Sequence, residues 1–243
     1  MEFIGIIPAR YASTRFPGKP LINIKGKTMI QRVYEQSSKA FETVLVATDD
    51  ERIEKAVTGF GGKVIMTSEK HKSGTDRCNE AIEKYSISSG NKYDVIVNIQ
   101  GDEPFIQPEQ LDKIKFCFNS QEIQIATLVK KIEDIDDIFN PNKPKVIFNK
   151  NKEAIYFSRS PIPYIRNYKE PDWLNNHVFY KHIGLYAYRI DVLKKITQLK
   201  QSSLEIAESL EQLRWIENGY KIKIEITEYE SISIDTIEDL EKL

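Results

Sequence analysis

The stretch FIGIIPARYASTRFPGKP, residues 3–20, combines a buried strand candidate with a basic loop. Phe3 to Ile7 is short and almost continuously apolar, which is typical of a strand covered on both faces in a parallel sheet. Arg10, Arg15 and Lys19 follow it closely. Arg can grip phosphate oxygens with two parallel hydrogen bonds, and Lys supplies a compact point charge. The loop is therefore a candidate polyphosphate site, with a solvated basic turn as the alternative.

The loop lacks the glycine patterns of the common nucleotide-binding motifs. It contains neither GxxxxGK[ST] nor GxGxxG, so a Walker-type ATPase or a dinucleotide oxidoreductase is not supported. Gly18 would let the backbone pass close to a ligand, and Pro17 and Pro20 stiffen the segment around it. The sequence thus requires another kind of phosphate chemistry.

Strand and helix candidates alternate outward from this stretch. The strand candidates are residues 3–7, 43–47, 63–66 and 95–99, and the helix candidates are residues 29–41, 51–60, 75–85 and 109–118. Strands separated by helices of about ten residues predict parallel pairing through right-handed crossovers, the doubly wound α/β architecture. Ligands of such sheets bind at the carboxyl ends of the strands. The basic loop, residues 48–50 and QGDEP at residues 100–104 all follow strand candidates and should meet at that edge.

The second half of the chain has a different composition. Residues 140–189 are rich in aromatic side chains and short strand patterns, with Pro and Asn breaks between them, which predicts a β-rich insertion. Such an excursion more often forms a subunit interface or an active-site wall than a separate domain. We therefore expect one domain over residues 1–243 and a homodimer. The remaining expected elements are a helix at 203–218, a strand at 221–226 and a terminal helix opened by Asp235 and Thr236.

Composition excludes several classes of protein. Lys and Arg number 35 against 36 Asp and Glu, so the net charge of −1 offers no general attraction to nucleic acid or to an anionic membrane. The N-terminus has no basic region before its short apolar run, and no stretch approaches ~18 apolar residues. The sequence therefore predicts a soluble, cytosolic (cytoplasmic) protein. Cys78 and Cys117 are too few and too unpatterned for a metal cluster or a disulfide scaffold, and we expect two reduced thiols packed in helices.

Two aspartates are candidate metal ligands. Asp102 lies on the QGDEP turn that follows a strand candidate. Mg²⁺ prefers hard oxygen ligands and commonly takes one or two protein carboxylates. A single acidic turn is usually a solvated loop, but its place beside a basic phosphate loop favours a metal site. Asp235 also follows a short apolar strand and precedes a helix, where an N-cap is the alternative that the pattern alone favours.

Eight sequence blocks along the chain resemble those of a known family. The blocks are IPARYASTRFPGKPL, ATDDERI, SGTDR, VNIQGDEP, YFSRSPIP, HIGLYAYR, LEQLRWIENGYKI and IDTIEDLE, in this order. Their order and spacing resemble the 3-deoxy-manno-octulosonate (Kdo) cytidylyltransferases, or CMP-Kdo synthetases, over nearly the whole chain. The resemblance implies a nucleotide-diphospho-sugar transferase (Rossmann-like) fold with a mostly parallel sheet. It also implies a homodimer, Mg²⁺ dependence and cytoplasmic synthesis of a lipopolysaccharide precursor.

The reaction that the resemblance implies is CTP + Kdo → CMP-Kdo + pyrophosphate. One alternative is a sister enzyme for another 2-keto sugar acid, such as sialic acid. Another is a catalytically silent nucleotide-binding module. The joint presence of Asp102 and Asp235 favours an enzyme, because a protein that only binds a nucleotide has no need of both.

The resemblance also implies roles for individual residues. The triphosphate and the leaving pyrophosphate would be held by the catalytic cations Arg10, Arg15 and Lys19. Asp102 and Asp235 would hold Mg²⁺. The expected CTP contacts are Ala9, Arg10, Arg15, Lys19, Ser73, Gly74, Thr75, Asp76 and Arg77. The expected contacts with the sugar acid are Gln100, Arg159, His182, Tyr186, Glu211 and Gln212.

Several of these residues have simpler interpretations without the resemblance. SGTDR, residues 73–77, is a capping-box-like helix start, a role that can coexist with base recognition. His182 fits a strand histidine in a packed sheet, and Tyr186 fits a core aromatic residue. Glu211 and Gln212 sit together on a helix candidate, where a solvated face is the default.

Overall fold

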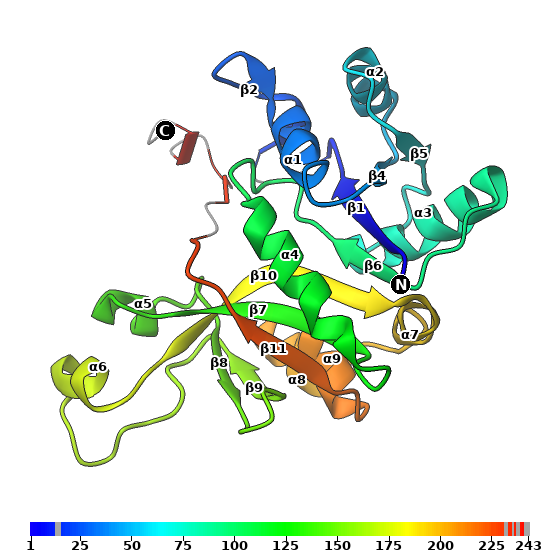
Figure 1. The fold of residues 1–243 in the computed structure, drawn as a ribbon. Coiled ribbons are helices and arrows are strands. Elements are labelled where there is room, and N and C mark those ends of the chain that lie inside the picture. The colour runs from blue at the N-terminus through cyan, green and yellow to red at the C-terminus, as the bar shows by residue number, and fades with distance from the viewer. Residues whose placement is uncertain (13–15, 231–232, 235, 237–238, 241–243) are drawn as a thin grey trace. The chain divides into compact units, whose positions relative to one another are not determined.

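The computed structural model describes residues 1–12, 16–230, 233–234, 236 and 239–240. Over these residues the chain is mixed α/β and divides into two compact units (Figure 1). The first unit comprises Met1–Asp112, Ala187–Thr197 and Ser231–Leu243, and the second comprises Lys113–Tyr186 and Gln198–Glu230. Neither unit is continuous in sequence. None of the helices that the structure describes is long and apolar enough to span a membrane.

The first unit is built on a parallel sheet with the strand order β6-β1-β4-β5. These strands are β1 (Phe3–Ala9), β4 (Val44–Thr48), β5 (Val64–Met66) and β6 (Val95–Asn98). β1 lies between β4 and β6, with Gly5 opposite Val44 and Ile4 opposite Ile96. All four strands were predicted, because a sheet buried on both faces requires the continuous apolar runs that mark them in the sequence.

Helices connect these strands, and three of them start at a side chain that caps the helix. They are α1 (Met29–Ser37), α2 (Glu51–Gly59), α3 (Gly74–Ser89) and α7 (Ile190–Ile196), and α4 (Pro108–Phe116) begins in this unit. A short hairpin of β2 (Asn23–Ile24) and β3 (Lys27–Thr28) precedes α1. The N-cap side chains Thr28, Asp50 and Ser73 each accept a backbone N–H, at 3.3, 2.9 and 3.1 Å. The caps fix where α2 and α3 leave the sheet edge.

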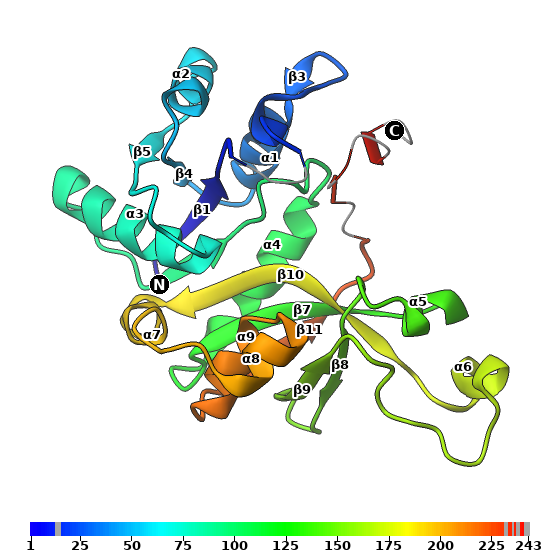
Figure 2. The same cartoon turned by 180° about the vertical axis from the view of Figure 1, so that it is seen from behind.

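The second unit contains the expected β-rich segment. Its strands are β7 (Ile125–Lys131), β8 (Lys145–Phe148), β9 (Ala154–Ser158), β11 (Ile222–Ile226) and β10 (Tyr180–Arg189), which runs on into the first unit. β11 pairs with β7 in parallel, whereas β8 pairs with β9 and β10 in antiparallel. The helices are α5 (Ile135–Phe139), α6 (Trp173–Asn176), α8 (Ser203–Glu208) and α9 (Gln212–Glu217). Figure 2 shows α8 and α9 side by side next to these strands.

The structure corrects several boundaries. The helix expected over 203–218 is broken into α8 and α9, because Ser209 has a left-handed backbone with φ +50° that ends α8. The helix expected over 29–41 ends at Ser37. The sequence analysis did not predict β7. The two cysteines are free and buried, as predicted, Cys78 in α3 and Cys117 in a short 3-10 helix.

Candidate active site

The described part of the basic loop is held in shape by an aromatic side chain. Gly18 has φ +74° and donates its N–H to the carbonyl of Tyr11 at 2.9 Å. A Cβ at this position would meet the Tyr11 ring at 3.1 Å, so glycine is required twice over. The Arg52 guanidinium stacks on the Tyr11 ring, 3.3 Å from the ring centroid. Arg52 is held in turn by the Asp50 carboxylate, which accepts from its Nε and Nη2 at 2.9 and 2.6 Å. Arg10 is exposed at the start of this loop, and Arg15 lies outside the described residues.

Lys19 and Asp102 lie in direct contact. Lys19 Nζ donates to Asp102 Oδ2 at 2.6 Å, and both side chains are partly exposed. The Asp102 carbonyl also accepts the N–H of Ile234 at 3.0 Å, which ties Ile234 to this turn. The structure therefore brings a loop cation and a candidate metal ligand together, as predicted from their places after two parallel strands. Asp235, the second candidate metal ligand, lies outside the described residues.

The residues around the start of α3 lie beside the end of β1. Ser73 caps the helix through its bond to the Asp76 N–H, and Thr75 is buried. A Cβ at Gly74 would meet Pro8 Cγ at 3.1 Å, so the helix start and the strand end are in close contact. The predicted base-contacting segments, one after β1 and one at α3, are thus neighbours. This position also leaves the N-terminal N–H groups of α3 at the sheet edge where ligands of this fold class bind.

Arg77 is committed to bonds inside the first unit. Its side chain is 1% exposed, and it donates to Thr67 Oγ1 and to Asp49 Oδ2, both at 2.7 Å. Thr67 in turn donates to the carbonyl of Thr48 at 3.1 Å. Arg77 therefore holds the first turn of α3 to the ends of β4 and β5. A direct contact between Arg77 and CTP stays a prediction.

The predicted sugar-contacting residues of the second unit gather around β10 and α9. The His182 and Tyr186 rings lie 5.2 Å apart, and Tyr186 meets Trp215 edge to face at 5.1 Å. Burial lowers the pKa of His182 to about 3, so its imidazole is neutral, and it shares a 3.1 Å hydrogen bond with Thr127 Oγ1. Burial, and then the nearby charge of Glu211, raise the pKa of Tyr186 well above 10.

Gln212 and Glu211 of this group offer polar atoms to a ligand. Gln212 is buried, and its Nε2 has no hydrogen-bond partner among the residues that the structure describes. A buried donor left without a partner is costly, which makes a ligand acceptor at this position favourable. Glu211 precedes it at the start of α9. Gln100, the remaining predicted contact, lies in the first unit directly after β6.

Arg159 lies at the end of β9 and reaches the turn between α8 and α9. Its Nε donates to the Glu208 carbonyl at 2.7 Å, and its Nη2 donates to the Ser209 carbonyl at 3.2 Å. Its Nη1 donates to the Pro141 carbonyl at 2.8 Å. None of these three partners carries a negative charge, and together they use three of the five N–H donors of the guanidinium.

The sequence analysis missed the side chains that hold these residues in place. Asp49 fixes Arg77, Arg52 covers Tyr11, and Glu208 contacts Arg159. Asp49 was expected at the sheet edge within residues 48–50, but its bond to Arg77 was not predicted. Glu208 gave no comparable signal, since its partners are about fifty positions away in the sequence.

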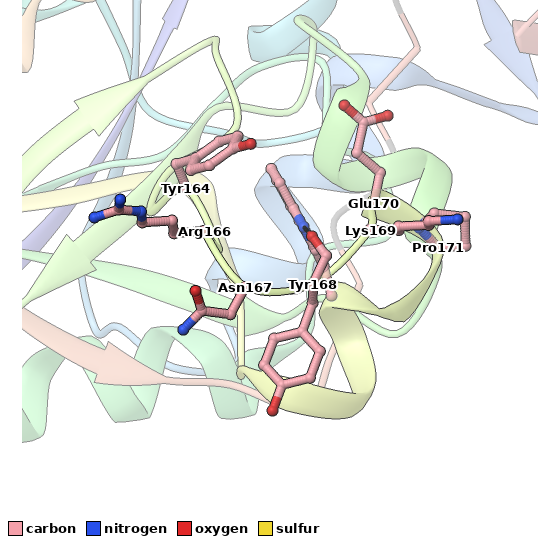
Figure 3. Close-up of a pocket in the computed structure, with 8 residues that line it drawn as sticks. Tyr164, Arg166, Asn167, Tyr168, Lys169, Glu170 and Pro171 are labelled. Atoms are coloured by element: carbon pink, nitrogen blue, oxygen red, sulfur yellow. Dashed lines mark hydrogen bonds between the residues drawn. The ribbon is translucent and has the colours of Figure 1, made fainter.

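A separate hollow of about 520 Å³ lies in the insertion, between β9 and β10 in sequence. Figure 3 shows its lining, which is formed by Tyr164, Arg166, Asn167, Tyr168, Lys169, Glu170, Pro171 and Trp173. Tyr164 is 73% exposed and meets the buried Trp173 edge to face at 5.4 Å. None of the predicted site residues that the structure describes lines this hollow.

Comparison with known proteins gives matches to cytidylyltransferases along most or all of the chain. Residues 4–224 match the family model described as cytidylyltransferase. A 3-deoxy-manno-octulosonate cytidylyltransferase of Parabacteroides distasonis is 67% identical, covering 100% of this chain and 96% of the relative. The enzyme of the same name from Bacteroides thetaiotaomicron is 63% identical, covering 99% and 96%. The solved structure of a CMP:2-keto-3-deoxy-manno-octonic acid synthetase complexed with CTP has a TM-score of 0.90 and 42% identity, covering 100% and 96%.

Proposed function

Because the chain belongs to the cytidylyltransferase family, we propose that it transfers CMP from CTP to the anomeric hydroxyl of Kdo. The products are CMP-Kdo, which activates Kdo for lipopolysaccharide synthesis, and pyrophosphate. The relatives' name and the CTP complex of the solved structure support this assignment. The observation in this chain that carries it is the contact between Lys19 and Asp102, which joins the candidate phosphate-binding loop to the candidate metal ligand.

The reaction requires the protein to position two anions and to neutralise charge. The anomeric hydroxyl attacks the α-phosphorus while pyrophosphate leaves in line. Lys19 and Arg10 would hold the triphosphate from the loop after β1, together with Arg15. Each such donor is typically worth roughly 10²- to 10³-fold in rate. The N-terminus of α3, from Ser73 to Arg77, and Ala9 would contact the cytosine.

The donors at the end of β6 fit Mg²⁺. Asp102 supplies a carboxylate oxygen, the ligand type that Mg²⁺ prefers, and Lys19 would exchange this partner for a phosphate. No cluster of three or more metal-binding side chains occurs among the described residues, so Asp235, water and substrate phosphates would complete the shell. Thr236 Oγ1 accepts the Asp239 N–H at 3.3 Å, and Asp239 Oδ2 accepts the Thr236 N–H at 3.0 Å. When bound, Mg²⁺ would neutralise phosphate charge and acidify the attacking hydroxyl.

The sugar acid would be bound by the side chains around β10 and α9 of the second unit. Arg159 would attract the carboxylate of Kdo, since its present partners are neutral carbonyls. The unpartnered Nε2 of Gln212 would donate to a sugar oxygen. The neutral imidazole of His182 would form a hydrogen bond with a hydroxyl of the sugar acid. Tyr186 and Glu211 would lie beside it. Gln100 would contribute from the first unit.

The proposal includes a homodimer, in which a second copy of this chain would pack against the exposed side chains of the β-rich insertion. The insertion exposes Tyr164, Tyr168 and Val178 at 73%, 50% and 45%. Clustered exposed aromatic and aliphatic side chains mark association surfaces.

We treat residues 1–243 as one domain, because the family match runs across both discontinuous units. We place the reaction in the cytoplasm, where CTP is made.

The test is a coupled pyrophosphate assay with CTP, UTP, ATP and GTP, each supplied with Kdo or with sialic acid in the presence of Mg²⁺. We expect pyrophosphate release from CTP only when Kdo and Mg²⁺ are both present. Equal release with sialic acid would assign the chain to a sister enzyme. Absence of release with every pair would reject an enzymatic function.

A further inference from the structure

The carboxylate of Glu208 joins the end of α8 to the end of β9. Glu208 Oε1 accepts from Ser158 Oγ at 2.6 Å, and Oε2 accepts from the Arg159 backbone N–H at 2.9 Å. Tyr156 is a third neighbour, because burial and then the charge of Glu208 raise the pKa of its phenol. Ser158 is buried, so this contact is shielded from solvent. The two oxygens of Glu208 therefore hold two adjacent residues, Ser158 through its hydroxyl and Arg159 through its backbone N–H.

The Arg159 side chain returns to the segment that carries Glu208. Its Nε and Nη2 donate to the carbonyls of Glu208 and Ser209, at 2.7 and 3.2 Å. Ser209 has φ +50°, a conformation that non-glycine residues rarely adopt, so the turn needs outside support to keep it. Glu208 and Arg159 thus form a closed pair, in which each fixes the backbone next to the other.

Lys145 fixes the opposite side of Arg159. This fully buried lysine donates from Nζ to the Arg159 carbonyl at 2.7 Å and to the Asn140 carbonyl at 2.9 Å. The peptide groups on both sides of Arg159 are therefore held by charged side chains. Charge-assisted hydrogen bonds of this kind are shorter and stronger than neutral ones, which gives the Arg159 backbone a fixed position.

The turn that Glu208 and Arg159 support leads directly to the proposed sugar contacts. Only Leu210 separates Ser209 from Glu211, and Gln212 opens α9. We propose that Glu208 is a positioning residue for sugar-acid binding, which sets Arg159, Glu211 and Gln212 in place without touching the substrate. This inference rests on the proposed function for the identity of the sugar acid.

A glutamine at position 208 would weaken this arrangement. Its amide oxygen can accept the Arg159 N–H, and its NH₂ group can donate to Ser158 Oγ, which would then have to accept instead of donate. Both charge-assisted hydrogen bonds would become neutral, and therefore weaker, ones. The volume of the side chain stays the same, so the loss falls on the hydrogen bonds.

The chain offers a matched control at the other end of the same helix pair. Glu217 also accepts from a serine hydroxyl and from a backbone N–H, Ser203 Oγ at 2.9 Å and Leu204 N at 3.1 Å. It joins the end of α9 to the start of α8, away from the Ser209 turn. Glu217→Gln therefore disturbs the α8–α9 pair by the same chemistry without acting on Arg159.

The experiment measures pyrophosphate release with CTP and Kdo varied independently. For Glu208→Gln we expect the KM for Kdo to rise about tenfold, because both hydrogen bonds lose their charge, with the KM for CTP within about twofold. Ser158→Ala removes the bonds of the Ser158 hydroxyl to Glu208 and from the Ser160 N–H but keeps the charged bond from the Arg159 N–H to Glu208, so it should give a smaller rise in the same KM. Glu217→Gln should change neither KM. An unchanged KM for Kdo in Glu208→Gln, or equal changes in the control, would overturn the proposal.

A second readout separates this proposal from the proposed function. Amide hydrogen exchange of residues 209–212 should speed up in Glu208→Gln and in Ser158→Ala relative to the wild type, and it needs no substrate. Should the wild type fail to release pyrophosphate from CTP and Kdo, the proposed function fails, while faster exchange would still locate the support of the turn. Unchanged exchange in both variants would contradict the positioning role by itself. Ser158→Ala keeps both tests available if Glu208→Gln does not fold.

Discussion

The two groups of predicted site residues, one in each unit, treat their positive charges differently. In the first unit, the Lys19 ammonium lies 2.6 Å from the Asp102 carboxylate, and the two charges cancel. In the second unit, the Arg159 guanidinium donates to three carbonyls, none of which carries a negative charge. Under the proposed function, Lys19 would exchange Asp102 for a phosphate when CTP binds. Arg159 would attract the carboxylate of the sugar acid without first giving up a charged partner.

The difference also concerns what holds each cation. The loop that carries Lys19 is shaped by Tyr11, which is covered by the exposed guanidinium of Arg52. The Arg159 backbone is held by Glu208 and by the buried Lys145. A loop that must admit a highly charged nucleotide benefits from exposed contacts, whereas a site for one small sugar acid benefits from a fixed geometry.

Asp102→Asn is the change with the largest expected effect. It keeps the size of the side chain but removes the charge that pairs with Lys19 and that would bind Mg²⁺. We expect kcat to fall by roughly 10³-fold while the melting temperature changes little, because both side chains are partly exposed. The control is Asp191→Asn on α7, whose side chain is 68% exposed. Turnover near the wild-type value in Asp102→Asn would remove Asp102 from the metal role.

Glu205→Ala tests whether the ion pair between Glu205 and Arg214 stabilises the helices α8 and α9 of the second unit. Glu205 accepts from Arg214 Nε at 2.8 Å and from Nη2 at 2.5 Å, and both residues are buried. Removing Glu205 leaves the charge of Arg214 buried without that carboxylate, so the free energy of unfolding should fall by about 3 kcal/mol. Urea unfolding measures this loss. A change as small as that of the exposed Asp191→Ala would show that the pair does not support α8 and α9.

The pH dependence of stability should show that His182 stays neutral. Its pKa is lowered from 6.5 to about 3 by burial. Between these values the unfolded chain binds a proton that the folded protein does not, so the free energy of unfolding falls as the pH is lowered from 6.5 towards 3. The stability that neutral His182 contributes is complete above pH 6.5.

His182→Gln isolates this contribution. We expect the variant to lose less stability than the wild type between pH 6.5 and 4, as measured by chemical denaturation at each pH. The comparison uses the change with pH in each protein, so a constant cost from losing the Thr127 contact cancels. Parallel curves for the two proteins would mean that His182 titrates normally in the folded state.

The sheet of the first unit was predictable because its signals are local. Short apolar runs mark β1, β4, β5 and β6, and Asp50 and Ser73 stand where the helices begin. The rule that parallel strands end at one edge was enough to expect Lys19 near Asp102. Their contact confirms that the two side chains lie together, while their roles in binding stay predictions.

The arrangement of the second unit depends on contacts that no local pattern reveals. A serine at φ +50° breaks the expected helix, although serine has no special preference for that conformation. Arg159 and Glu208 lie 49 positions apart and fix each other. Arg77 was predicted from its motif, but its burial against Asp49 became visible only in the fold.

The most direct test of the difference between the two sites is the steady-state kinetics of Arg159→Lys, with CTP and Kdo varied independently. Lysine keeps the charge but cannot form the fork that reaches the turn and a carboxylate together. We predict a rise of at least about tenfold in the KM for Kdo, with the KM for CTP within about twofold. A raised KM for CTP with an unchanged KM for Kdo would contradict this account of the two sites.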